Sequence, residues 1–126
     1  MNNITVLEAP SNLGLIEPAP GKEPGVKNLP ALLRSKGFYE RIQAGRIVPV
    51  PAPAYSMEYD AESGVRNADN IAAYSKQLAE QVQGQVKNGK FPLVIGGDCS
   101  ILIGCMLGLK QLGDYGLFFI DGHTDF

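Results

Sequence analysis

A chain of 126 residues that is 44% hydrophobic and 19% charged has the composition of one ordinary globular domain, which we place at residues 1–126. Its formal charge of −2, with scattered lysine and arginine, argues against nucleic acid as a partner. No apolar run approaches the roughly 18 residues that span a bilayer, and the N-terminus lacks the pattern of a signal peptide. We therefore expect no membrane partner and a cytoplasmic location.

Short strand-like runs alternate with helical patterns along the first half of the chain. Residues 4–9 are β-prone, and residues 46–52 form a second such run whose prolines favour an edge strand. Between them, the Pro/Gly-rich residues 10–25 predict a loop. A helix of about three turns is expected from Pro30 onward, with Gly37 as a break or C-cap.

The second half repeats this alternation. A helix is predicted over about residues 67–88, from apolar side chains at helical spacing: Ile71, Leu78, Val82 and Val86. An apolar run over 91–97, a helical stretch over 100–113 and a further apolar run over 115–121 follow it.

These last three segments predict a βαβ unit. Uninterrupted apolar runs on both sides of a helix are typical of a parallel sheet that is covered on both faces. Gly104 and Gly108 would let that helix lie close to the sheet. With no internal repeat and no domain boundary, the sequence predicts a single α/β domain with a mostly parallel sheet.

Two polar motifs lie at the ends of the predicted strands. G-G-D-C-S occupies 96–100, and D-G-H-T-D occupies 121–125. Ligands of open parallel α/β sheets collect at the carboxyl ends of the strands. We therefore expect the two motifs to be neighbours in space.

The second motif has the pattern of a metal site. In extended backbone, Asp121, His123 and Asp125 project to one side, so two carboxylates and one imidazole converge. This set suits Mn²⁺, Zn²⁺ or Fe²⁺, and either carboxylate could bridge two ions. The alternative is that the aspartates cap turns or pair with basic residues, and that His123 is an ordinary loop side chain.

The first motif places Cys99 after a Gly-Gly turn and near a helix N-terminus, where a thiolate is favoured. Our first interpretation is a metal ligand, which would favour Zn²⁺ or Fe²⁺ over Mn²⁺. The second is a small side chain without a chemical role, and the third is a nucleophile paired with His123. Asp98 and Ser100 are expected to cap the helix or to hydrogen-bond to metal ligands. We expect no disulfide with Cys105.

The two motifs resemble those of the ureohydrolase family, which includes arginase, agmatinase and formimidoylglutamase. In that family a Gly-Gly-Asp-His-Ser turn and an Asp-Ala-His-x-Asp strand end supply ligands to a two-manganese centre. The segments G-G-D-C-S and D-G-H-T-D are similar to them, and their separation by one helix and one strand also fits. The stretch E-P-G-V-K-N-L-P-A-L-L-R-S-K-G-F is similar to the family's entry into its first helix, so the resemblance covers essentially the whole chain.

The resemblance implies a three-layer α/β/α fold and hydrolysis of a guanidino or amidino C–N bond by a metal-bridging hydroxide. It implies Mn²⁺ as the metal and a small guanidino or amidino compound as the substrate. Asp121 and Asp125 would bind or bridge metal, and His123 would hold the second ion. Asp125 would also accept a hydrogen bond from the hydroxide, which makes it the candidate catalytic residue.

The sequence departs from the family pattern at two points. Cys99 stands where the family has a histidine ligand, so Zn²⁺ and Fe²⁺ enter as alternatives to Mn²⁺. The family's later Asp-x-Asp ligands do not occur in these 126 residues, so we expect the N-terminal portion of a longer arginase-like domain, inactive alone.

An unpaired strand edge near Phe126 also predicts self-association. Two other functions stay open. One is a non-catalytic α/β interaction module, and the weaker one is a thiol hydrolase that uses Cys99 and His123.

Overall fold

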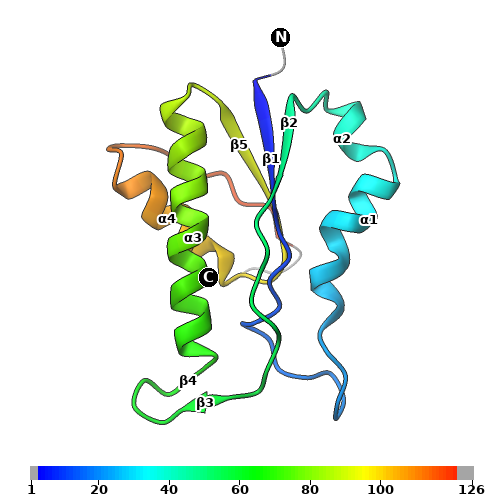
Figure 1. The fold of residues 1–126 in the computed structure, drawn as a ribbon, viewed down its shortest axis with the longest axis vertical. Coiled ribbons are helices and arrows are strands. Elements are labelled where there is room, and N and C mark those ends of the chain that lie inside the picture. Colours follow the sequence, from blue (N-terminus) through cyan, green and yellow to red (C-terminus); the bar gives the residue numbers. More distant parts are fainter. Residues whose placement is uncertain (1–2, 122–126) are drawn as a thin grey trace.

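The chain folds into a parallel sheet between two layers of helices (Figure 1). The computed structural model describes residues 3–121. The central strand β1 (Ile4–Ala9) pairs in parallel with β2 (Arg46–Pro49) on one side and with β5 (Phe91–Gly96) on the other. This confirms the predicted α/β class with a parallel sheet and the edge position of the second strand.

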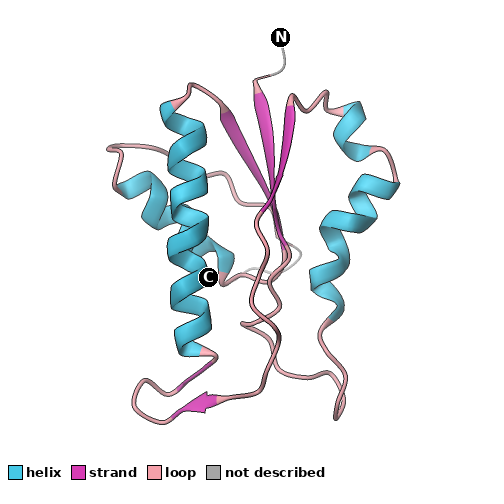
Figure 2. Ribbon diagram, in the orientation of Figure 1, coloured by secondary structure: helices cyan, strands magenta, loops and turns pink. Residues whose placement is uncertain are grey.

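Helices cover both faces of the sheet (Figure 2). On one side lie the 3₁₀ helix η1 (Gly25–Asn28), α1 (Leu29–Ser35) and α2 (Phe38–Arg41). On the other side lie α3 (Ala68–Lys87) and α4 (Ile101–Lys110). The sheet therefore has a helical layer on each face, as the predicted three-layer arrangement requires.

The hydrophobic core lies between β1 and α3. Residues 5–9 of β1 are all buried, as expected for a central strand that is covered on both faces. The buried core cluster comprises Leu7, Ala9, Val50, Tyr74, Leu78, Val82 and Cys105. Each fully buried large aliphatic side chain contributes roughly 1.5–3 kcal/mol to folding, so this cluster holds β1 and α3 together.

Two helix predictions are confirmed. The long helix predicted over about 67–88 is α3, whose buried side chains follow a helical period. Gly37 has a φ of 70° and separates α1 from α2, so it is the predicted break. The sequence reasoning missed a short antiparallel hairpin, in which β3 (Tyr59–Asp60) pairs with β4 (Val65–Arg66).

The strand predicted over residues 115–121 is wrong, because these residues adopt no regular structure. Leu117 packs against the core, whereas Phe118 and Ile120 are 89% and 84% exposed. An apolar run predicts burial, but a strand also needs a backbone partner. Among the described strands only β1 pairs with β5, so the predicted βαβ unit is not closed.

The role predicted for Gly104 and Gly108 also needs correction. A Cβ atom at Gly104 would lie 2.7 Å from the carbonyl oxygen of Ser75, and one at Gly108 would lie 2.8 Å from that of Ala79. Ser75 and Ala79 both belong to α3. The two glycines therefore let α4 lie close to α3 rather than to the sheet.

Candidate metal site at the ends of β1 and β5

The turn that follows β5 packs tightly against the end of β1. Gly97 has a φ of +98°, a conformation that glycine adopts far more readily than other residues, and the Gly96–Gly97 peptide bond is cis. A Cβ atom at Gly97 would clash with the carbonyl oxygen of Ala9 and lie 2.9 Å from that of Ser11. Glycine is therefore required here, because the two strand ends approach each other with backbone atoms alone.

Asp98 fixes this contact with its buried carboxylate. Its backbone N–H donates to the carbonyl oxygen of Ser11 at 2.9 Å. Its Oδ2 accepts from the Ser11 hydroxyl at 3.0 Å and from the Gly14 N–H at 3.2 Å, and its Oδ1 accepts from the Ser100 N–H at 2.7 Å. Asp98 is only 5% exposed, so these three donors replace the water that a free carboxylate would bind.

The Asp98 network tests two expectations from the sequence. Ser100 occupies the N-cap position of α4 but makes no side-chain capping hydrogen bond. Asp98 instead accepts the Ser100 N–H and closes a turn before the helix. Ser11 and Gly14 donate hydrogen bonds to this carboxylate, and the sequence reasoning missed both residues. Their only signal was the position of P-S-N-L-G directly after a strand.

A second buried carboxylate holds the opposite helical layer. Glu8, at the end of β1, accepts from Arg34 through Nε at 3.2 Å and Nη2 at 2.7 Å. The Tyr39 hydroxyl lies 3.0 Å from Oε1 of Glu8, and burial raises the pKa of Tyr39 above its usual value. Glu8 thus links β1 to α1 and α2 on this side of the sheet.

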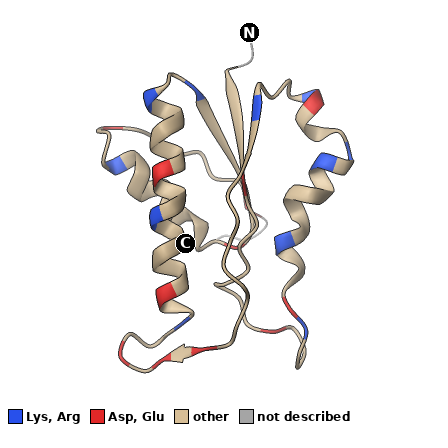
Figure 3. Cartoon of the chain, in the orientation of Figure 1, with Lys and Arg blue, Asp and Glu red and all other residues tan. Residues whose placement is uncertain are grey.

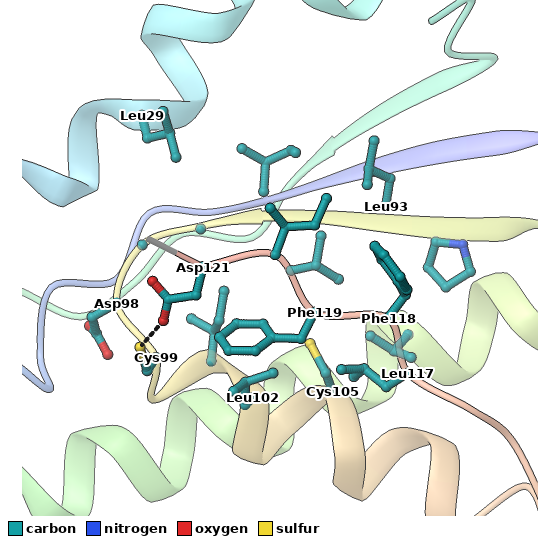
Figure 4. Close-up of a pocket in the computed structure, with 18 of the residues that line it drawn as sticks. Leu29, Leu93, Asp98, Cys99, Leu102, Cys105, Leu117, Phe118, Phe119 and Asp121 are labelled. Atoms are coloured by element: carbon teal, nitrogen blue, oxygen red, sulfur yellow. Dashed lines mark hydrogen bonds between the residues drawn. The ribbon is translucent and has the colours of Figure 1, made fainter. Parts of the chain in front are cut away.

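Cys99 and Asp121 meet beside the Asp98 turn. The Cys99 Sγ donates to Oδ2 of Asp121 at 3.3 Å, although 22 residues separate them in sequence (Figure 4). Both residues are exposed. Asp121, the first residue of the second motif, therefore lies beside the first motif, as predicted, although no strand precedes it in the described chain.

Two of the four predicted metal ligands lie within the described residues. Cys99 and Asp121 lie together, whereas His123 and Asp125 lie outside the described residues. Within residues 3–121 no three His, Cys, Asp or Glu side chains converge as a metal site would require. The metal-ligand role of all four residues thus stays a prediction.

The Cys99 and Asp121 pair passes a geometric test for sharing one ion. A tetrahedral ion with bonds of about 2.3 Å to sulfur and 2.1 Å to oxygen separates those atoms by about 3.6 Å. The observed separation of Sγ and Oδ2 is 3.3 Å, so a small adjustment would suffice. Both carboxylate oxygens of Asp98 already accept hydrogen bonds, from one O–H and two N–H groups. Asp98 is therefore better placed to hold the turn than to bind metal.

A largely apolar pocket of about 850 Å³ opens beside this pair. It runs along β5 between α1 and α4, and Asp98, Cys99 and Asp121 form its polar end (Figure 4). Cys105 also lines it, and burial raises the pKa of its thiol to about 11. Neither cysteine forms a disulfide, as expected, and Cys105 stays a neutral thiol at pH 7.

Charges are spread over the molecule. Figure 3 shows lysine and arginine distributed over several helices and strands of the described chain rather than gathered on one face. No helix within residues 3–121 is long and apolar enough to cross a membrane.

Comparison with known proteins connects this sequence and this fold to one family. The sequence matches the Arginase family over residues 4–126. It is 30% identical to an arginase of Bacillus caldovelox over 133 residues, covering 99% of this chain and 42% of that protein. It is 32% identical to Arginase-1 of Homo sapiens over 127 residues, covering 97% of this chain and 38% of that protein.

Solved arginase structures show the same similarity in their fold. The structure of the Bacillus caldovelox arginase superposes with a TM-score of 0.70 at 30% identity, covering 89% of this chain and 38% of that one. An arginase of Bacillus subtilis gives a TM-score of 0.69 at 26% identity, covering 89% and 36%. The chain thus spans about two fifths of the length of the curated relatives that it matches.

Proposed function

This chain belongs to the arginase family, and we propose that the protein containing it is a metal-dependent hydrolase that cleaves a guanidino or amidino C–N bond. The contact between Cys99 and Asp121 is the observation that carries the proposal. It joins the two motifs that resemble the family's metal-binding segments, at the strand ends where α/β proteins bind their ligands.

The residues that would hold divalent metal are Cys99, Asp121, His123 and Asp125. Mn²⁺ is the ion expected from the family. A bound divalent ion lowers the pKa of water toward neutrality and so supplies a nucleophile at pH 7. Asp125 would orient that nucleophile by accepting a hydrogen bond from it. Asp98 would hold the turn that carries Cys99 against the end of β1.

The substrate and the partners follow from the same proposal. A small guanidino or amidino compound would be the substrate. Because the family's later Asp-x-Asp pair is not among these residues, we expect the 126-residue chain alone to be inactive. We also propose that copies of the 126-residue chain self-associate, since one edge of β5 is unpaired within the described chain.

The test measures urea release from arginine, agmatine and guanidino acids, and glutamate release from formimidoylglutamate, by the expressed gene product that contains this chain. We expect turnover of at least one substrate with Mn²⁺ or Zn²⁺ present, its loss on chelation, and a fall of 100-fold or more, on the order expected for removing a metal ligand, in His123→Ala.

Two results would count against the proposal. Activity that survives chelation but is lost on thiol alkylation would favour the Cys99 and His123 thiol hydrolase. No turnover of any of these substrates, together with no retained metal, would leave the non-catalytic module as the better account. The control is Asp114→Asn, because Asp114 is exposed, follows α4 and lies away from the site. Its substitution should leave the activity unchanged.

A further inference from the structure

We propose that Cys99 is a metal ligand and that its thiolate makes this site select a thiophilic ion such as Zn²⁺ over Mn²⁺. The inference rests on the proposed function and deepens it, because it names the ion that these residues favour. It concerns the one position in the two motifs where this chain has a sulfur in place of the expected imidazole.

The position of the sulfur is the first step. Cys99 Sγ lies 3.3 Å from Oδ2 of Asp121, close to the separation of about 3.6 Å between a thiolate and a carboxylate oxygen on one tetrahedral ion. Cys99 is exposed, so an ion can reach its sulfur from solvent. By contrast, Cys105 is buried against the core and packs with apolar neighbours.

The rigidity of the turn is the second step. Cys99 lies between Asp98, whose carboxylate accepts three hydrogen bonds, and Ser100, whose N–H is one of the donors. The preceding Gly97 touches the backbone of Ala9 and Ser11. A ligand on a turn that is fastened on both sides is preorganised, which favours metal affinity because little order is lost on binding.

The chemistry of the donor atoms is the third step. Thiolate is a soft ligand that suits Zn²⁺ and Fe²⁺, whereas Mn²⁺ is a harder ion that favours carboxylate and imidazole. On binding, the Cys99 thiol forms the sulfur–metal bond and releases its proton to solvent, and no electron is transferred. With histidine in place of Cys99, the same turn would present a nitrogen that serves Mn²⁺ as well.

The experiment titrates Co²⁺, a spectroscopic substitute for Zn²⁺, into the reduced, metal-free gene product under anaerobic conditions. We expect a thiolate-to-cobalt charge-transfer band in the near ultraviolet. The band should be lost in Cys99→Ser and in Cys99→His, and retained in Cys105→Ala, the matched control that removes the other thiol. Circular dichroism checks that each variant is folded.

A competition measurement gives the selectivity. Zn²⁺ binds most protein sites more tightly than Mn²⁺, so a high ratio of their affinities is not diagnostic in itself. The diagnostic quantity is the change in that ratio between the native chain and Cys99→His. We expect it to fall by tenfold or more when the sulfur is replaced by imidazole.

The outcomes separate this inference from the proposed function. If Co²⁺ binds without a charge-transfer band, and the affinity ratio is the same in Cys99→His, the sulfur only donates a hydrogen bond to Asp121. The inference is then overturned and the proposed metal-dependent function stands. If neither the native chain nor Cys99→His retains any of these ions, both are overturned.

Discussion

Asp98 is the residue on which the geometry of the candidate site most depends. It is buried, its side chain accepts three hydrogen bonds, and its own N–H closes the contact to the loop after β1. The neighbouring Cys99 is exposed. The buried acid therefore sets the position of the exposed thiol, and not the reverse.

Replacing Asp98 by asparagine should lower the free energy of unfolding by about 2–4 kcal/mol. Hydrogen bonds to a charged acceptor contribute roughly 1.5–3 kcal/mol each, and an amide turns an NH₂ group toward donors that need an acceptor. Urea denaturation measures the change. The matched control is the exposed Asp114→Asn, which should stay within about 0.5 kcal/mol of the native chain. Equal effects of the two substitutions would contradict this account of Asp98.

At the scale of elements, α3 and α4 make the most extensive helix–helix contact of the described chain. Their approach depends on Gly104 and Gly108, which bring α4 against the carbonyl oxygens of Ser75 and Ala79. A third helical glycine, Gly84 of α3, has nothing within 4 Å of the position of its missing Cβ atom. Gly84 is therefore a control for the effect of replacing a glycine at a helix contact, because it lies in a helix but touches no neighbouring element at its Cβ position.

Gly104→Ala should lower the free energy of unfolding by about 1–3 kcal/mol, because an added methyl group in a tight contact forces the helices apart. Gly84→Ala should raise it by about 0.5–1 kcal/mol, because alanine is the better helix former and the site is open. Chemical denaturation of both variants measures the difference. A stabilising Gly104→Ala would show that α4 does not need its close contact with α3.

The elements also show what the sequence could and could not predict. The apolar spacing of Ile71, Leu78 and Val82 predicted α3 because a helix is specified by local periodicity. The strand predicted over 115–121 was wrong because pairing is non-local, and an apolar run carries no information on its partner. Gly104 likewise indicated a close approach without showing which element would approach.

The candidate site was predictable to the same extent. The predicted proximity of Cys99 and Asp121 is confirmed by their hydrogen bond. The strand-end rule placed only Cys99 correctly, after β5, because the residues before Asp121 form no strand. The Asp98 network was beyond the sequence, because the donors on Ser11 and Gly14 lie more than 80 residues away along the chain.

At the scale of the whole molecule, β2 and β5 are both edge strands within the described chain, each paired only with the central β1. Large apolar side chains are exposed along the free edge of β5. We define the β5-side patch as Phe91, Phe118, Phe119 and Ile120, which are 58%, 89%, 37% and 84% exposed and line the pocket along β5. An exposed apolar patch beside an open strand edge favours association.

We expect the chain to associate in a concentration-dependent manner through the β5-side patch, and Phe118→Lys to weaken that association by roughly 10- to 100-fold. Burying a phenylalanine contributes about 1.5–3 kcal/mol, and about 1.4 kcal/mol corresponds to a factor of ten in Kd. Sedimentation velocity over a range of concentrations measures the effect. Ile16→Lys is the matched control, because Ile16, like Phe118, is a large exposed apolar residue (69% exposed) but lies in the loop after β1, outside the patch. Equal weakening by both substitutions would point to non-specific apolar contact, and a chain that stays monomeric at all concentrations would show that the β5 edge is already protected.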